Sequence, residues 1–194
     1  MKVLGITGGV GSGKSQVLAY LQETYGANIC QLDEVAKKLQ QRGGSCFEQI
    51  LLAFGENVRG ADGELNRECL GQIVFRDKEK LQILNQIVHP EVKRWVQQDI
   101  SEKKAEGVSL YVIEAALMPD AGYDDICQEM WYIYTEESVR RIRLKASRDY
   151  SDEKITQMIQ SQPSEEQFRK ISDVVIDNSG SFEETKKKIG ELIS

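Results

Sequence analysis

Residues 8–15 read GGVGSGKS, which matches the phosphate-binding pattern G-x-x-x-x-G-K-[ST] at every fixed position. The apolar run at 3–7 is typical of a buried strand, and the segment 16–21 is typical of a helix. A strand, then this loop, then a helix is the context in which the pattern binds phosphate. The stretch therefore predicts a nucleoside triphosphate site on an α/β fold.

The chemistry of this loop explains its residue types. Glycines at positions 8, 9, 11 and 13 are expected to adopt positive φ and to approach a ligand without a Cβ clash. Successive N–H groups and the positive end of the following helix then attract phosphate. Lys14 is expected to neutralise the β- and γ-phosphates of the nucleotide, and the Ser15 hydroxyl to bind Mg²⁺. The predicted ATP-binding residues of the loop are Gly8, Gly9, Gly11, Ser12, Gly13, Lys14, Ser15 and Gln16.

Composition narrows the class of protein. With 194 residues, 40% hydrophobic and 29% charged, the chain suits one α/β domain with an inserted or appended lobe. A net charge of −6 argues against nucleic acid as a partner. The four cysteines form no C-x-x-C pair and, with a single histidine, predict free thiols rather than a zinc site.

The N-terminal residues and the hydropathy of the sequence predict where in the cell the protein works. The N-terminal apolar run is only a few residues long and stops at Gly8, which is unlike a signal peptide. No window approaches the length that spans a bilayer. We therefore expect a cytoplasmic protein without a membrane partner, working as a monomer, with a small homo-oligomer as the alternative.

Short apolar segments outline the core. Continuous apolar runs bounded by polar or glycine turns suit a parallel sheet covered on both faces. Five such runs lie at 2–6, 28–32, 109–114, 130–134 and 173–176. The predicted fold is therefore a five-stranded parallel sheet flanked by helices, the P-loop NTPase fold. Its core should comprise approximately 1–33, 108–135 and 171–194.

The remaining segments are predicted to be helical. Residues 34–107 exceed one crossover connection and are expected to form an acceptor-binding lobe, with helices near 34–41, 45–54, 67–75 and 78–104. In the last of these, an apolar face is formed by Leu81, Leu84, Val88, Val92, Trp95 and Val96. Pro90 is expected to restart this helix rather than to continue it. Residues 136–170, with helices over 136–148 and 151–170, should form a lid, and 181–193 a final helix.

Two acidic residues follow predicted strands at the edge where such folds bind ligands. Asp33 can accept a proton from an attacking hydroxyl, and its alternative role is an N-cap for the next helix. Glu114 can contact the acceptor or Mg²⁺, and its alternative is a solvated turn residue.

Other candidates lie in the lobes and at the last strand. Arg140, Arg143 and Arg148 can neutralise charge on the transferred phosphoryl group, or can form a solvated helix face. His89 is either structural or hydrogen-bonded to the acceptor. Asn178, after the last strand, can contact the adenine base or serve as a turn residue.

Taken in order, these residues resemble the dephospho-CoA kinase family over nearly the whole chain. The resemblance rests on the loop, Asp33, His89-Pro90 and Arg143, and on four further matches. The further matches are Arg148-Asp149, Gln162, Arg169 and the stretch 173–180. The chain departs from the family pattern at Gln31, at 114–118, where it reads EAALM, and near Asp149.

The resemblance implies ATP-dependent phosphorylation of the ribose 3′-hydroxyl of dephospho-CoA, which gives CoA and ADP. It implies catalytic roles for Asp33, Lys14, Arg148, Arg143 and Arg140, with Mg²⁺ as the metal. Another small-molecule kinase and an inactive ATP-binding homologue stay open as alternatives. A GTPase switch is disfavoured because the chain has no N-K-x-D.

Overall fold

The computed structural model describes residues 1–115, 123, 125–148 and 150–193. The chain divides into two compact units. The first combines Met1–Cys30 with Lys103–Ser194, and the second is Gln31–Glu102. Because the first unit is built from both ends of the chain, the second is an insertion into it.

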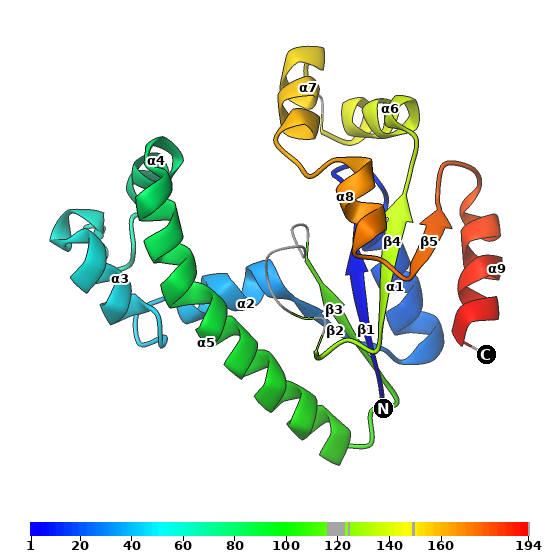
Figure 1. The fold of residues 1–194 in the computed structure, drawn as a ribbon, viewed down its shortest axis with the longest axis horizontal. Coiled ribbons are helices and arrows are strands. Elements are labelled where there is room, and N and C mark those ends of the chain that lie inside the picture. The colour runs from blue at the N-terminus through cyan, green and yellow to red at the C-terminus, as the bar shows by residue number, and fades with distance from the viewer. Residues whose placement is uncertain (116–122, 124, 149, 194) are drawn as a thin grey trace. The chain divides into compact units, whose positions relative to one another are not determined.

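The first unit is organised around a sheet whose strand order is β2-β3-β1-β4-β5 (Figure 1). Its strands are β1 (Lys2–Thr7), β2 (Asn28–Gln31), β3 (Leu110–Glu114), β4 (Glu129–Tyr134) and β5 (Val174–Asp177). β1 pairs in parallel with β3 and β4, and β4 pairs in parallel with β5. The predicted five-stranded parallel sheet is thus confirmed, to within one residue at each strand end.

The position of β1 in the sheet explains where the loop lies. The chain leaves β1 and later returns to the sheet on both of its sides, through β3 and β4. In open α/β sheets, ligands bind beyond the carboxyl ends of strands at such a switch point. The loop at 8–15 begins directly after β1 ends at Thr7, so the fold presents it at that point.

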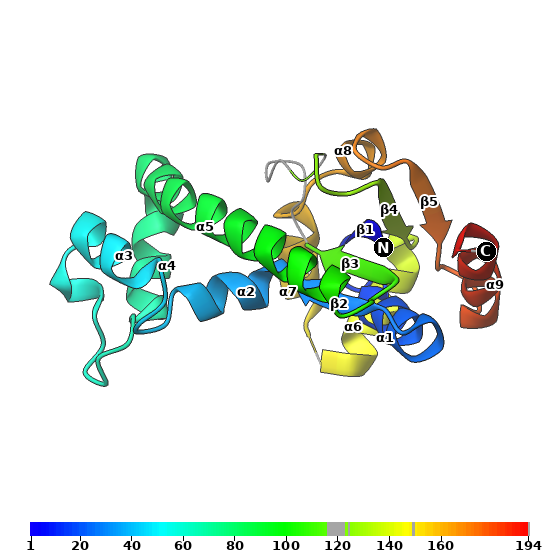
Figure 2. The same ribbon diagram turned by 90° about the horizontal axis from the view of Figure 1, so that it is seen from below.

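Helices cover both faces of this sheet. α1 (Lys14–Tyr25) and α9 (Phe182–Ile193) share a core with one face, in which Leu4, Trp131 and Ile189 are buried (Figure 2). On the other face, the ring of Tyr132 stacks on Phe168 of α8 (Glu165–Lys170), with 5.0 Å between ring centroids. Burial of these apolar surfaces is the main term that stabilises the fold.

The predicted helix over 151–170 is wrong in one respect. The structure contains two helices there, α7 (Asp152–Gln160) and α8, which follow α6 (Glu137–Arg148). Pro163 has no N–H to continue the first helix. Ser164 then starts the second with a capping box, in which its hydroxyl accepts from Gln167 N and Gln167 Oε1 accepts from Ser164 N.

The second unit is helical. It contains α2 (Leu32–Leu39), α3 (Phe47–Phe54), a 3₁₀ turn (Glu56–Val58), α4 (Arg67–Arg76) and most of α5 (Lys78–Ala105). The expectation that Pro90 restarts the last helix is wrong, because α5 runs through it. Val88, Val92 and Val96 are buried on both sides of Pro90, and this shared apolar face offsets the lost hydrogen bond. Leu81, placed on the same face by sequence, is instead 41% exposed.

The structure also bears on the predictions about membrane-spanning segments and about the state of the cysteines. Among the described residues, no helix is both long enough and apolar enough to cross a bilayer. All four cysteines lie among the described residues and none forms a disulfide; Cys30 and Cys46 are buried.

Candidate active site

The loop has the backbone conformation that its glycines predict at three of their four positions. Gly8, Gly11 and Gly13 have φ of +155°, +77° and +86°. Gly13 is also the N-cap of α1, so the loop leads directly into the helix. The expectation of positive φ at Gly9 is wrong. A Cβ there would lie 2.6 Å from Nη2 of Arg140, so a larger residue would require the guanidinium to move.

Lys14 points back over the loop. Its Nζ donates a hydrogen bond of 2.6 Å to the Gly8 carbonyl and lies 3.8 Å from Oε1 of Glu114. Glu114 is the last residue of β3 and is only 9% exposed, which excludes the solvated turn residue considered from the sequence. The ammonium and the carboxylate are thus brought together beside the loop, where charge interactions are stronger than in water.

The first turn of α1 is formed by Lys14, Ser15, Gln16 and Val17. Ser15 and Gln16 are exposed, so the Ser15 hydroxyl is accessible to a ligand at the helix N-terminus. Ser12 is buried instead, and its hydroxyl has no hydrogen-bond partner among the described residues. Ser12 therefore contributes to the loop through its backbone, as the next contacts show.

The buried side-chain amide of Asn178 stabilises the phosphate-binding loop through hydrogen bonds. Asn178 is 1% exposed, its Nδ2 donates to the Ser12 carbonyl at 2.8 Å, and its Oδ1 accepts from Thr185 Oγ1 at 2.8 Å. Thr135 Oγ1 donates to the same Ser12 carbonyl at 3.0 Å. The sequence suggested Asn178 as an adenine contact. The structure places its side chain in the interior, where it supports the loop.

This arrangement predicts a stability effect. We expect Asn178→Ala to lower the free energy of unfolding by about 1–3 kcal/mol, because Thr185 and the Ser12 carbonyl each lose a buried partner. Urea denaturation monitored by circular dichroism measures this change. Gln22→Ala, which removes an exposed amide on α1, is the matched control and should stay within about 0.5 kcal/mol. Equal stability of the two variants would contradict the buried role of Asn178.

Two of the predicted arginines are anchored to the protein. Arg143 Nη2 donates to the Asn178 carbonyl at 2.8 Å. Arg140 Nε donates to the Val10 carbonyl at 2.8 Å, and burial lowers the pKa of its guanidinium below the ordinary value. The sequence left open that these arginines form a solvated helix face. Their hydrogen bonds within the protein exclude that alternative for Arg140 and Arg143. The side chain of Arg148 and the whole of Asp149 lie outside the described part of the chain.

Asp33 and His89 belong to the second unit. Asp33 is an exposed residue in the first turn of α2, and the N-cap of that helix is Gln31. The N-cap alternative for Asp33 is therefore wrong, although an acid in the first turn still favours the helix dipole. His89 is exposed on α5, next to Pro90. The departure at 114–118 falls mostly on residues 116–118, which are not described.

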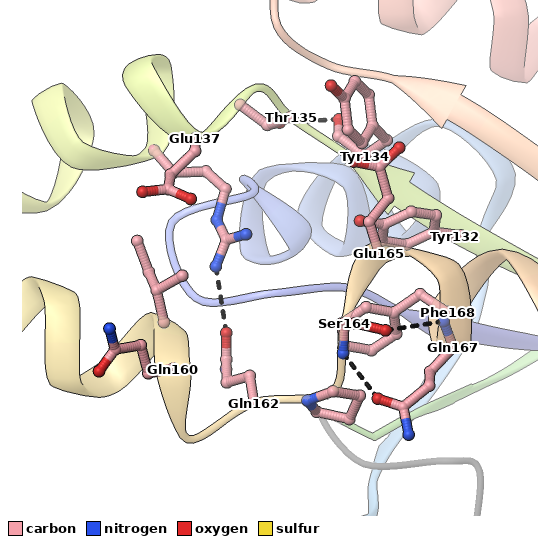
Figure 3. Close-up of a pocket in the computed structure, with 13 residues that line it drawn as sticks. Tyr132, Tyr134, Thr135, Glu137, Gln160, Gln162, Ser164, Glu165, Gln167 and Phe168 are labelled. Carbon is pink, nitrogen blue, oxygen red and sulfur yellow. Dashed lines mark hydrogen bonds between the residues drawn. The ribbon is translucent and has the colours of Figure 1, made fainter.

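A cavity of about 430 Å³ opens beside the loop (Figure 3). Its walls come from the end of β4, from α6, and from α7 and α8 with the segment that joins them, and include Tyr132, Tyr134, Arg140, Gln162 and Phe168. Reasoning from the residues alone did not identify Gln162 or Thr135 as loop contacts, or Thr185 as the partner of the Asn178 side chain. Gln162 was indicated only by the family pattern.

Comparisons with known proteins agree with one another. The family model described as dephospho-CoA kinase matches residues 2–184. The dephospho-CoA kinase of Carboxydothermus hydrogenoformans is 36% identical over 189 residues, which cover 97% of this chain and 91% of that protein. The structure of TT1252 from Thermus thermophilus has a TM-score of 0.83 at 29% identity, covering 99% and 96% of the two chains. The dephospho-CoA kinase structure from Campylobacter jejuni has a TM-score of 0.71 at 26% identity, covering 99% and 98%.

Proposed function

We propose a mechanism for this chain, which belongs to the dephospho-CoA kinase family and is an ATP-dependent kinase. The γ-phosphoryl group of ATP passes to the ribose 3′-hydroxyl of dephospho-CoA, and the products are CoA and ADP. The observation that supports this most directly is the loop itself, with Lys14 folded over it beside Glu114 and with Gly13 at the N-terminus of α1. Such a site is built to bind phosphate.

In this proposal, the loop N–H groups and Lys14 hold the β- and γ-phosphates. P-loop kinases generally act with a divalent metal, and Mg²⁺ fits the oxygen donors present here, the exposed Ser15 hydroxyl and the Glu114 carboxylate. When bound, the metal would neutralise charge on the phosphate oxygens. The buried carboxylate of Glu114, 3.8 Å from Lys14 Nζ, helps to orient the ammonium.

The acceptor is assigned to the lobe 34–107 together with Asp33, His89 and Glu114. Asp33 orients the ribose 3′-hydroxyl and accepts its proton as the new O–P bond forms and the bond to ADP breaks. Arg148, Arg143 and Arg140, from the lid at 136–170, are assigned to neutralise charge on the transferred phosphoryl group, and closure of the lid would exclude water. Closure matters because an open site would transfer the phosphoryl group to water.

A panel of acceptors tests this substrate. The purified chain is incubated with ATP, Mg²⁺ and either dephospho-CoA or a nucleoside monophosphate, and the phosphorylated product is identified by mass. We expect product with dephospho-CoA alone. Efficient phosphorylation of the nucleoside monophosphate instead would favour the other small-molecule kinase considered from the sequence.

We further propose that the reaction takes place in the cytoplasm and that the chain works as a monomer. ATP and dephospho-CoA would be its partners, without nucleic acid or a membrane. The net charge of −6 supports the exclusion of nucleic acid. Sedimentation with and without ATP measures the oligomeric state.

A further inference from the structure

The tip of the phosphate loop is held by two side chains from outside the loop. The Val10 N–H donates to Gln162 Oε1 at 2.8 Å, and the Val10 carbonyl accepts from Arg140 Nε at 2.8 Å. Both backbone polar groups of Val10 are thus already hydrogen-bonded within the protein. We therefore assign this amide to supporting the shape of the loop rather than to binding phosphate.

The two side chains also contact each other. Arg140 Nη2 donates to Gln162 Oε1 at 3.1 Å, which is the bond drawn as a dashed line at Gln162 in Figure 3. A single oxygen therefore accepts from both Val10 and Arg140. We call Val10, Arg140 and Gln162 the tip clamp. Removing Gln162 Oε1 would leave the Val10 N–H and Arg140 Nη2 without this acceptor, at a partly buried site.

The clamp joins the loop to the segment that carries α7. Arg140 lies on α6, before α7, and Gln162 lies two residues after α7 ends at Gln160. Both side chains line the 430 Å³ cavity beside the loop. The Arg140 guanidinium also lies beside Gly9, where an added Cβ would be 2.6 Å from Nη2, so it is close to two neighbouring loop residues. The shape of the tip is therefore determined by residues 130 and 152 positions away in sequence.

We propose that Gln162 is a positioning residue for ATP: its Oε1 fixes the Val10 amide and Arg140, so that the loop is already in its phosphate-binding shape before ATP arrives. This proposal rests on the proposed function only in that the loop binds the ATP phosphates. A preorganised loop loses less conformational entropy on binding, so the clamp should act on ATP affinity more than on the chemical step.

Gln162→Met tests this role, because methionine keeps the length and bulk of glutamine but has no oxygen acceptor. We expect the Kd for ATP, measured by calorimetry without acceptor, and the KM for ATP to rise about tenfold, with kcat changed less than about threefold. Gln160→Met is the matched control, since Gln160 lines the same cavity and has no hydrogen bond to the loop. It should bind ATP like the unchanged protein.

Amide hydrogen exchange of Val10 in the nucleotide-free protein distinguishes the loss of its hydrogen bond to Gln162 from a change in side-chain packing. Gln162→Met should speed this exchange at least about tenfold, whereas Gln162→Glu, which keeps the accepting oxygen, should preserve the protection. If Gln162→Met does not fold, Gln162→Asn, which withdraws the oxygen by one carbon, takes its place.

Unchanged ATP affinity with unchanged Val10 exchange in the Met variant would overturn the proposal, as would a loss of protection in the Glu variant equal to that in the Met variant. Failure of the proposed function would look different. The chain would then make no CoA, while the differences between the variants in ATP affinity and Val10 exchange would remain.

Discussion

Lys14→Ala is expected to lower the turnover of dephospho-CoA by at least about 10²-fold while the protein stays folded. The Lys14 ammonium sits over the loop, 2.6 Å from the Gly8 carbonyl, where it would meet the β- and γ-phosphates. Charge on these oxygens redistributes during transfer, so a fixed cation stabilises the transition state more than the bound substrate. Steady-state kinetics with saturating substrates measures the loss.

A second lysine variant provides the comparison for this result. Lys187→Ala removes an exposed lysine on α9, and its turnover should match that of the unchanged protein. Thermal unfolding of both variants shows whether the fold is intact. A Lys14→Ala enzyme that retains turnover within about threefold would remove this lysine from the mechanism.

Asp33→Asn should also cut turnover by about 10² or more, with little change in the KM for ATP. Asparagine has the shape of aspartate but cannot accept the proton of the ribose hydroxyl, so the loss should fall on the transfer step. Because Asp33 is exposed in the first turn of α2, this change should leave stability nearly unchanged. Product formation followed by mass, at saturating ATP and acceptor, measures the loss.

The neighbouring Glu34 gives a close control. It is exposed on the same helix turn and pairs with Lys37 at 2.6 Å, an interaction of little energetic weight at the surface. Glu34→Gln should therefore keep normal turnover. If Asp33→Asn were as active as Glu34→Gln, Asp33 would not be the base, and the proton would have to leave by another group.

The features that sequence predicted correctly have local causes. The loop at 8–15 is determined by neighbouring glycines, a lysine and a serine, and its strand and helix follow from the residues on each side. The five strands could be located because each is a short apolar run, a pattern that β3 shows by being buried at every position. These patterns were sufficient for the sheet and for the loop that leads from β1 into α1.

The features that sequence missed depend on residues far apart in the chain. Nothing in the local sequence around Asn178 indicates that its amide is shared between Ser12 and Thr185. Likewise, the Pro90 error came from treating a local helix breaker by itself, whereas tertiary packing of Val88, Val92 and Val96 keeps α5 continuous. The contact of Gln162 with Val10 spans 152 residues and could only be seen in the folded chain.

The proposal that this chain phosphorylates dephospho-CoA is tested most directly by measuring ADP and CoA together. The purified protein is given ATP and Mg²⁺, with and without dephospho-CoA, and both products are quantified by mass. We expect ADP release that depends on dephospho-CoA, with one CoA formed for each ADP. ATP binding without any CoA, or ADP release that is the same without the acceptor, would contradict the account.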